Sequence, residues 1–281
     1  MSLYPHLGVA VAFSPRLRNL LAEAAARWPR FSEKISLLHA GPHSEEKEAA
    51  LREALRDAGL PIDTAIHWSR SGSPADAILR MVDQHQIDLL LAGALERERP
   101  LRYYLGSVAH NLVRHASCSL LLLTEPSAEP KPFRNIVVVT DYSEASAVAF
   151  ARVLRFTVQN GADVVHVVRV LSQYGEAMIL SEGVRRAHAE AYHARTKAEE
   201  KSLLADFVAS AGVQGAPVEP HILEGRTGVI IAQFVRETKA DLLVMPSSSQ
   251  TSHFFERLFP SDMEWVLREI PCNLWVARER L

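Results

Sequence analysis

Several kinds of residue and segment are scarce in this sequence, and each scarcity excludes a class of protein. With 2 cysteines in 281 residues, a disulfide framework and a four-thiolate metal site are excluded. No apolar run reaches the roughly 18 residues of a membrane-spanning helix, and the opening MSLYPHLG lacks the features of a signal peptide. A formal net charge of −2 provides no basic face for nucleic acid. We therefore expect a cytoplasmic protein with no nucleic-acid and no membrane partner.

The sequence does contain an internal repeat. DLLLAG at Asp88–Gly93 matches DLLVMP at Asp241–Pro246, and LVRHASCSLLLL at Leu112–Leu123 matches VLREIPCNLWVA at Val266–Ala277. In the second pair the two cysteines fall in register, each at the start of an apolar run. A repeat of this length indicates a duplicated structural unit.

The repeat also sets the expected domain boundaries. The segment TEPSAEPKPF, between the two copies, is rich in proline and polar residues, as is typical of a linker between folded units. We predict a first domain over residues 1–126, a linker over 127–133 and a second domain over 134–281.

Within each copy, short apolar runs alternate with amphipathic segments, which predicts a parallel sheet covered by helices on both faces. The fold class is therefore α/β, with two tandem doubly wound domains of five strands each. Helices are expected to begin at Ser14-Pro15, Ser44 and Ser73-Pro74. The expected strands are 7–12, 35–40, 62–69, 88–93 and 119–124 in the first copy, and 135–140, 163–170, 217–223, 241–245 and 273–277 in the second.

The second copy is longer than the first by 24 residues, and the extra length falls within 172–204. This segment predicts a loop at the end of the sheet where ligands bind, followed by a long, charge-rich helix. One interpretation is a solvated helix with a surface loop. The other makes Met178, Ile179 and Leu180 a lid or a partner contact, because exposed apolar clusters often mark interaction sites.

The strand that ends at Gly93, and the Gly106-Ser107 pair that opens a helix ahead of Cys118 and an apolar strand, resemble the universal stress protein family. The resemblance covers nearly the whole chain as two tandem copies and implies an adenine nucleotide alpha hydrolase-like fold. In nucleotide-binding members, G-2x-G-9x-G-[S/T] follows the fourth strand and cradles phosphates, and an Asp that ends the first strand contacts the adenosine.

In the first copy, Gly93 fits the first glycine of that pattern, and Gly106 with Ser107 fits the final pair. A glycine there lets the backbone approach an anion, and a helix N-terminus favours negative charge. Glu96 replaces the second glycine, and Ala12 stands where the family has its Asp. The resemblance thus implies a candidate nucleotide site that lacks some of its parts.

The second copy departs from the pattern elsewhere. Asp141 follows the first strand, at the family position. The phosphate loop instead carries Pro246 and Ser249 in place of the first two glycines, and Pro260-Ser261 in place of the final pair. Proline has no N–H to donate. Asp141 is a candidate nucleotide-binding residue, and the alternative is that it orders the turn before a helix.

Other chemistry finds little support in the sequence. His110 and His115, like His188 and His193, are five residues apart, so neither pair shares one helix face as metal ligands would. His39 ends a predicted strand near the expected cleft, where it could contact a ligand or belong to the core. We identify no catalytic residue and no metal site.

Three functions follow as hypotheses. The first is a non-catalytic binding or regulatory protein of the stress response with degenerate nucleotide sites, acting through protein partners. The second is an ATP-binding protein, with Mg²⁺ as the possible cofactor and slow hydrolysis as a possible activity, that uses Gly93, Gly106 and Ser107. The third is a protein whose cleft binds another small ligand, such as a lipid or a metabolite.

The apolar strands SLLLL and NLWVA, which end the two copies, also need a partner. Family members commonly pair through this strand. The two copies could therefore cover each other within one chain, as a pseudo-dimer, or two chains could form a homodimer.

Overall fold

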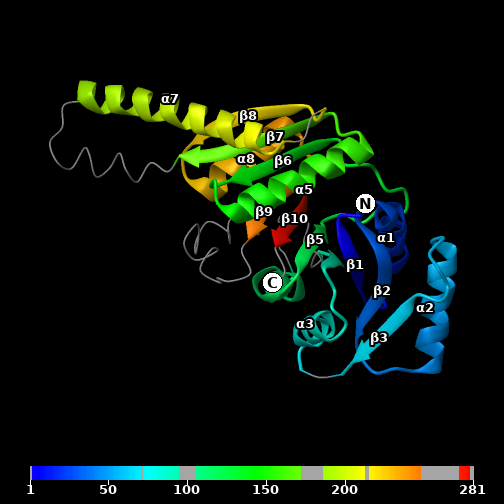
Figure 1. Cartoon of the computed structure of the whole chain (residues 1–281). Helices are drawn as coiled ribbons and strands as arrows, with labels where there is room; N and C mark the ends of the chain where they lie inside the picture. The colour runs from blue at the N-terminus through cyan, green and yellow to red at the C-terminus, as the bar shows by residue number, and fades with distance from the viewer. Residues whose placement is uncertain are drawn as a thin grey trace.

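The computed structural model describes residues 2–70, 72–94, 106–171, 186–212, 215–247 and 272–278. Their strands form one ten-stranded sheet in the order β3-β2-β1-β4-β5-β10-β9-β6-β7-β8 (Figure 1). The strands are β1 (Tyr4–Val11), β2 (Ser32–Ala40), β3 (Ala65–Ser69), β4 (Leu89–Gly93), β5 (Ser119–Leu123), β6 (Asn135–Thr140), β7 (Val164–Leu171), β8 (Val218–Glu224), β9 (Leu242–Ser247) and β10 (Asn273–Arg278). All ten predicted strands are confirmed, with ends that differ by a few residues.

The sheet consists of an N-terminal half, β1–β5, and a C-terminal half, β6–β10, with the same strand order. Every pairing within a half is parallel. The halves join through their last strands, which pair antiparallel with Leu121 opposite Trp275. Each apolar end strand thus covers the other within one chain, as the pseudo-dimer alternative predicts.

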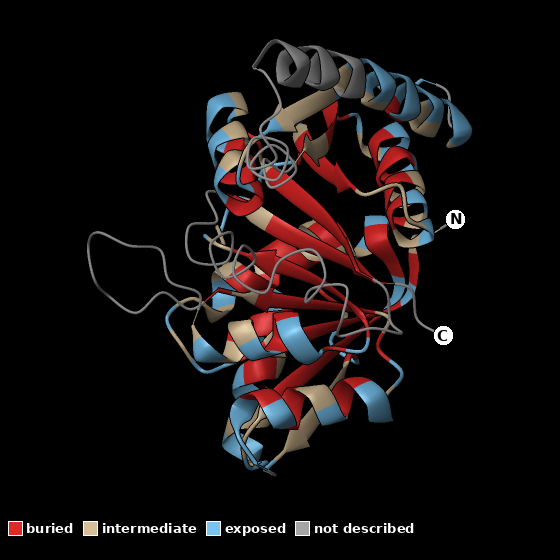
Figure 2. Ribbon diagram, turned by 90° about the vertical axis from the view of Figure 1, so that its left-hand side faces the viewer, coloured by how far each residue is buried: buried red, intermediate tan, exposed pale blue. Residues whose placement is uncertain are grey.

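Helices cover both faces of the sheet, and the strands between them are buried along most of their length (Figure 2). Buried side chains of α1, α2, α5 and α7 pack on one face, and those of α3, α4 and α8 on the other. The helices are α1 (Leu17–Phe31), α2 (Glu45–Asp57), α3 (Pro74–Gln84), α4 (Ser107–His115), α5 (Glu144–Asn160), α7 (Arg186–Ser210) and α8 (Thr227–Thr238).

Serine side chains fix the start of two of the three helices predicted to begin at a serine. Ser44 accepts a hydrogen bond from the Lys47 N–H at the start of α2. Ser73 forms a reciprocal capping box with Asp76 ahead of α3. The predicted start at Ser14-Pro15 is wrong. There the chain first makes a turn in which the N–H of Leu17 bonds the Ser14 carbonyl, and α1 begins at Leu17 without a side-chain cap.

The charge-rich helix predicted for the longer second copy is confirmed as α7, which extends well beyond the sheet in Figure 1. Its C-terminal part packs on the sheet, with Leu204 buried and Phe207 stacked on Phe150 of α5 at 5.5 Å between ring centroids. The predicted loop before α7, with Met178, Ile179 and Leu180, lies outside the described residues.

An aromatic cluster joins the two halves beside the β5–β10 pairing. Trp275 of β10 is fully buried and contacts Phe31 edge-on at 5.3 Å, and Phe31 stacks on Phe156 at 4.8 Å. The Trp275 indole N–H donates to the Tyr4 hydroxyl, which donates to Ser119 Oγ. Buried aromatic rings with satisfied polar groups are strong, specific contacts, so they fix how the halves meet.

Two buried arginines add polar contacts, one between the two halves and one between α1 and the linker. The guanidinium of Arg278, from β10, donates to the Val113 and Ala116 carbonyls at the C-terminal end of α4, where a cation is favourable. Arg27, in α1, pairs with Glu23 and donates to the carbonyl of Lys131 in the linker. The predicted linker therefore lies along α1 rather than spanning open solvent.

Candidate functional site

A cavity of about 440 Å³ opens in the N-terminal half at the carboxyl ends of β1, β2 and β4. The chain leaves β1 toward α1 on one face and β4 toward α4 on the other, which makes this the switch point where ligands of such sheets bind. Most of the wall is apolar. Its polar side chains are Ser14, Arg16, His39 and Ser107, and no lining residue among those described is Asp or Glu.

The three residues predicted for this half lie together, because Gly93, Gly106 and Ser107 all line the cavity. Neither position has a backbone conformation that favours glycine: Gly106 has φ −59°, and Gly93 is not among the glycines with positive φ. A Cβ on Gly93 would lie 3.7 Å or more from its nearest neighbours. Folding therefore does not require glycine at position 93, whereas close approach of a ligand to the backbone would.

Gly106 is the N-cap of α4, and Ser107 is the first residue of the helix, as predicted. Gly106 offers no side chain to cap the helix. The first-turn N–H groups of a helix have no acceptor within it, and Val108 and Ala109 bring this turn to the cavity wall. The arrangement can bind a small anion at one end of an otherwise apolar cavity. The charged spacer, 95–105 with Glu96, lies outside the described residues.

His39 belongs to both the core and the cleft. Its side chain is buried, and its Nδ1 donates to the Val11 carbonyl at 3.0 Å. Phe13 and Trp68 contact the ring edge-on, each at 5.0 Å. Burial lowers the pKa of the imidazole, against the opposing effect of its bond to Val11. His39 is therefore a fixed, neutral wall of the cavity at neutral pH.

Asp141, predicted for the C-terminal half, is engaged in its own turn. One carboxylate oxygen accepts hydrogen bonds from the Ser143 N–H at 3.0 Å, from Ser143 Oγ at 2.6 Å and from Ser146 Oγ. Ser143 in turn caps α5. These are the contacts of the alternative interpretation, in which the Asp orders a turn before a helix.

Beside Asp141, Tyr142 forms a further set of contacts with α7 and β7. Tyr142, in a left-handed conformation with φ 64°, donates from its hydroxyl to the Glu200 carboxylate of α7 at 2.8 Å. Arg169 of β7 lies 3.4 Å from the same carboxylate and over the Tyr142 ring at 5.0 Å. Burial, followed by the bond to Glu200, raises the pKa of the Tyr142 hydroxyl. α7 thus adds a polar cluster beside the ends of β6 and β7.

Of the C-terminal phosphate loop, Pro246 and Ser247 are described. Both are buried in β9, with Pro246 opposite Ala277 and Ser247 accepting from Arg278 at 3.3 Å. The strand therefore continues past the position at which β4 ends with Gly93. The rest of the loop, including Ser249 and Pro260-Ser261, lies outside the described residues.

The two candidate sites cannot combine into one. All pairings within each half are parallel, but β5 and β10 pair antiparallel. The strands of the two halves therefore run in opposite directions, and their carboxyl ends lie on opposite sides of the molecule. Asp141 is not among the residues that line the cavity with Gly93, Gly106 and Ser107.

Several of these residues are not predicted from the sequence. The sequence indicates Ser14 only as a helix start, and it does not indicate Arg16 or Glu200 as site residues. For Ser14 and Arg16 the available signal was their position directly after β1, in a loop that must reach the switch point. A separate cluster of His166, Glu219 and His221 was also missed. Its signal was E-x-H within a strand, where alternate residues share a face.

Within the described part of the chain, no helix is long and apolar enough to cross a membrane. Cys118 and Cys272 are both buried, and neither forms a disulfide. Burial raises the pKa of the Cys272 thiol to about 12, which makes it a poor nucleophile. The histidines five apart on α4, His110 and His115, belong to no cluster of metal ligands found among the described residues.

Comparisons with known proteins give the same picture of the fold. A universal stress protein from Archaeoglobus fulgidus DSM 4304 superposes with a TM-score of 0.68 at 16% identity, over 99% of this chain and 98% of that one. A protein of unknown function from Pseudomonas aeruginosa PAO1 superposes with a TM-score of 0.69 at 17% identity, over 99% and 93%. Both therefore share the whole tandem arrangement.

Sequence comparison identifies the family. Universal stress protein A of Yersinia pestis is 26% identical in an alignment of 110 residues that covers 32% of this chain and 73% of that protein. The model of the universal stress protein family matches twice, over residues 4–124 and 132–278. These two matches coincide with the two halves of the sheet, and the chain therefore belongs to the universal stress protein family as a tandem member.

Proposed function

We propose that this chain is a non-catalytic binding protein of the stress response, located in the cytoplasm, with degenerate nucleotide sites in both halves. The proposal rests on one observation: the parts of the family's nucleotide site are divided between the two halves. The N-terminal cavity has Gly93, Gly106 and Ser107 but no lining carboxylate among its described residues. The C-terminal half has Asp141, whose carboxylate is engaged by Ser143 and Ser146.

The chemistry of the cavity supports binding over catalysis. A metal ion that accompanies a triphosphate is usually held in part by carboxylate oxygens, and a general base needs a group free to accept a proton. Among the polar side chains of the described wall, His39 alone carries a group suited to a general base: its Nδ1–H donates to the Val11 carbonyl, which leaves Nε2 as the acceptor, and no Asp or Glu of the described wall accompanies it. The mostly apolar wall suits a small ligand with an apolar body and one anionic group.

One observation favours a second function, ATP binding with slow hydrolysis as a possible activity. Gly93, Gly106 and Ser107 lie on one wall beside the first turn of α4, where the family pattern holds phosphates. In this alternative, backbone N–H groups bind the phosphates, and Mg²⁺ is held by the nucleotide rather than by a carboxylate of the described wall.

Calorimetric titration of Mg-ATP into the purified chain separates the two functions, with Gly106→Asp as the test variant. Aspartate is a good N-cap residue, so α4 should still form, while its charge repels a phosphate. Ser44→Asp is the matched control, because Ser44 is the N-cap of α2 and does not line the cavity. Phosphate release measured on the same samples reports hydrolysis.

We expect no saturable heat of binding from Mg-ATP with the unmodified chain, and no phosphate release above a blank. Micromolar binding that Gly106→Asp abolishes and Ser44→Asp retains would overturn the proposal in favour of the ATP-binding alternative. Micromolar binding that survives both substitutions would contradict both functions, because the nucleotide would then bind outside this cavity.

A further inference from the structure

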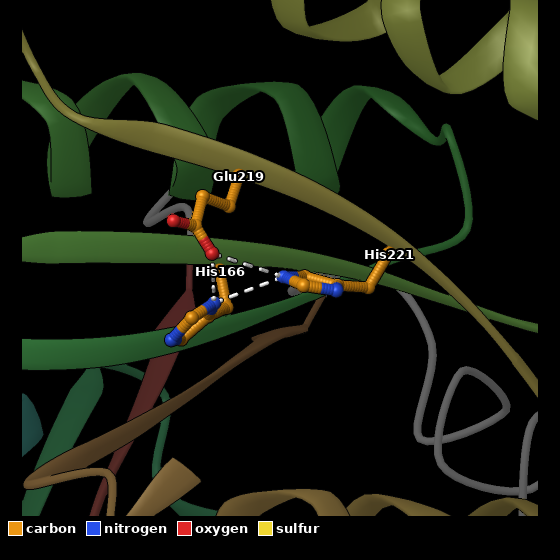
Figure 3. Close-up of side chains that lie close together, drawn as sticks. All are labelled: His166, Glu219 and His221. Atoms are coloured by element: carbon orange, nitrogen blue, oxygen red, sulfur yellow. Dashed lines mark hydrogen bonds and ion pairs between the residues drawn. The ribbon is translucent and has the colours of Figure 1, made fainter.

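Three side chains of metal-binding type converge on one face of the sheet in the C-terminal half, away from the candidate sites above. His166 lies near the amino end of β7, and Glu219 and His221 lie on the neighbouring edge strand β8. Figure 3 shows the two rings and the carboxylate directed toward a common point. Asp141, in contrast, follows the carboxyl end of β6.

Strand register explains the convergence. His166 pairs with Glu219, and Val168 pairs with His221. Residues two apart in a strand point to the same side, so Glu219 and His221 flank His166 on one face. Pro220, between them, has no N–H, which an edge strand tolerates. Phe234 of α8 contacts both rings, His166 at 5.6 Å and His221 at 4.9 Å between centroids.

The distances between the three donor atoms fit a single metal ion. His166 Nδ1 lies 2.9 Å from His221 Nε2 and 3.4 Å from a Glu219 carboxylate oxygen, and His221 Nε2 lies 3.7 Å from that oxygen. For metal–ligand bonds of about 2.0–2.1 Å in tetrahedral geometry, the ligand atoms stand roughly 3.3 Å apart. Small rotations of the side chains therefore bring all three atoms to bonding distance.

The surroundings suit a bound cation and give it access. The His166 side chain is 9% exposed, against 30% for His221 and 61% for Glu219, so the cluster opens to solvent on the side of β8.

We propose that His166, Glu219 and His221 form a binding site for one divalent transition-metal ion, of which Zn²⁺ is the best fit. Two imidazoles and a carboxylate are a common zinc ligand set, and three protein ligands leave a position for water. Bound there, the ion links the edge strand β8 to β7. It therefore stabilises the outer side of the C-terminal half.

The test titrates the full chain, stripped of metal, with Zn²⁺ by calorimetry and with Co²⁺ by visible absorption. Glu219→Gln and His221→Ala each remove one ligand from a partly exposed position, so both variants should fold. The matched control is His43→Ala, because His43 also pairs with a carboxylate, Glu48 at 2.8 Å, but belongs to no group of three metal ligands found among the described residues.

We expect one high-affinity Zn²⁺ per chain, a Co²⁺ spectrum typical of low coordination number, and a rise in thermal midpoint on adding Zn²⁺. Each ligand substitution should weaken binding on the order of 100-fold or more, since even outer partners of metal ligands cost 10–100-fold, and should remove the thermal shift. His43→Ala should change neither.

Two results would overturn the proposal. One is the absence of saturable binding at one equivalent of Zn²⁺, which would identify the trio as a hydrogen-bonded cluster of the sheet. The other is equal affinity in the unmodified chain, Glu219→Gln and His221→Ala, which would assign the ion to other histidines of the chain. Circular dichroism of each variant establishes that lost binding does not reflect lost folding.

Discussion

The two halves of this chain share strand order and face coverage, but their clefts have diverged in opposite ways. In the N-terminal half, the loop after β1 carries Ala12, and a cavity of about 440 Å³ remains between β1 and β4. In the C-terminal half, the corresponding loop carries Asp141, whose carboxylate accepts hydrogen bonds from Ser143 and Ser146, while the Tyr142 hydroxyl beside it binds Glu200. The N-terminal half thus has a cavity without the family's Asp, and the C-terminal half has the Asp, engaged in its own turn.

The contrast shows what tandem fusion permits. In a duplicated chain, either copy can lose part of a site while the joint sheet continues to fold. Here the antiparallel β5–β10 pairing places the carboxyl ends of the strands of one half opposite to those of the other half. The loss in one copy therefore cannot be compensated by the other. What both copies retain is the apolar end strand that joins them.

The largest expected effect comes from Trp275→Ala, which tests whether the halves depend on each other. Trp275 is fully buried against Tyr4, Phe31 and Phe156. Truncating a buried aromatic residue costs about 3–5 kcal/mol, and the Tyr4 hydroxyl also loses a donor. We expect a large fall in the urea midpoint, or two separate transitions as the halves uncouple.

Trp68→Ala is the matched control for this substitution. Trp68 is partly buried on the edge strand β3, where it contacts His39 and His43 rather than the other half. Its removal should lower the midpoint less and leave the number of transitions unchanged. Equal effects of the two substitutions would mean that the aromatic cluster is ordinary core and does not couple the halves.

Asp141→Ala should have an intermediate effect and bears directly on the contrast between the clefts. The change leaves the Ser143 N–H and the hydroxyls of Ser143 and Ser146 without their acceptor. Unmet polar groups of this kind cost about 1–3 kcal/mol. We expect a corresponding loss in urea unfolding, with Asp141→Asn as the control because it retains an acceptor oxygen. Unchanged stability would show that Asp141 does not order this turn.

The sequence predicts the fold closely because the signals are local and repeated. Short, continuous apolar runs such as SLLLL, repeated between amphipathic segments, indicate buried strands, and Ser44 and Ser73 are strong N-cap residues. Ser14 failed as a helix start because the chain makes a turn before α1, which a serine followed by proline does not distinguish from a cap.

The candidate sites are harder to predict, because they depend on pairs of residues distant in sequence. The spacing of the family pattern predicts that Gly93 and Gly106 share one site, and both residues line the cavity. No pattern indicates that Glu200, far along α7, binds the Tyr142 hydroxyl. His166 and His221 meet through strand register, and register between distant strands follows from packing rather than from local sequence.

The smallest expected effect concerns pH and compares the edge strands of the two halves. In the C-terminal half the edge histidine His221 lies beside Glu219, whereas in the N-terminal half His67 of β3 stacks on His85 at 3.4 Å between centroids. Burial, followed by the charge of His85, lowers the pKa of His67 from 6.5 to about 4.

Between pH 6.5 and about 4 the unfolded chain therefore binds more protons at His67 than the folded chain does. The stability that neutral His67 provides is fully present above pH 6.5 and is lost as pH falls through this window. His67→Gln, which does not titrate, should lose less in thermal midpoint between pH 7 and pH 5 than the unmodified chain. The difference is a fraction of the total, because burial also lowers the pKa of His39, His166 and His221. Equal losses in the two proteins would show that His67 titrates alike in the folded and unfolded chains, and that its contact with His85 does not disfavour the charged ring.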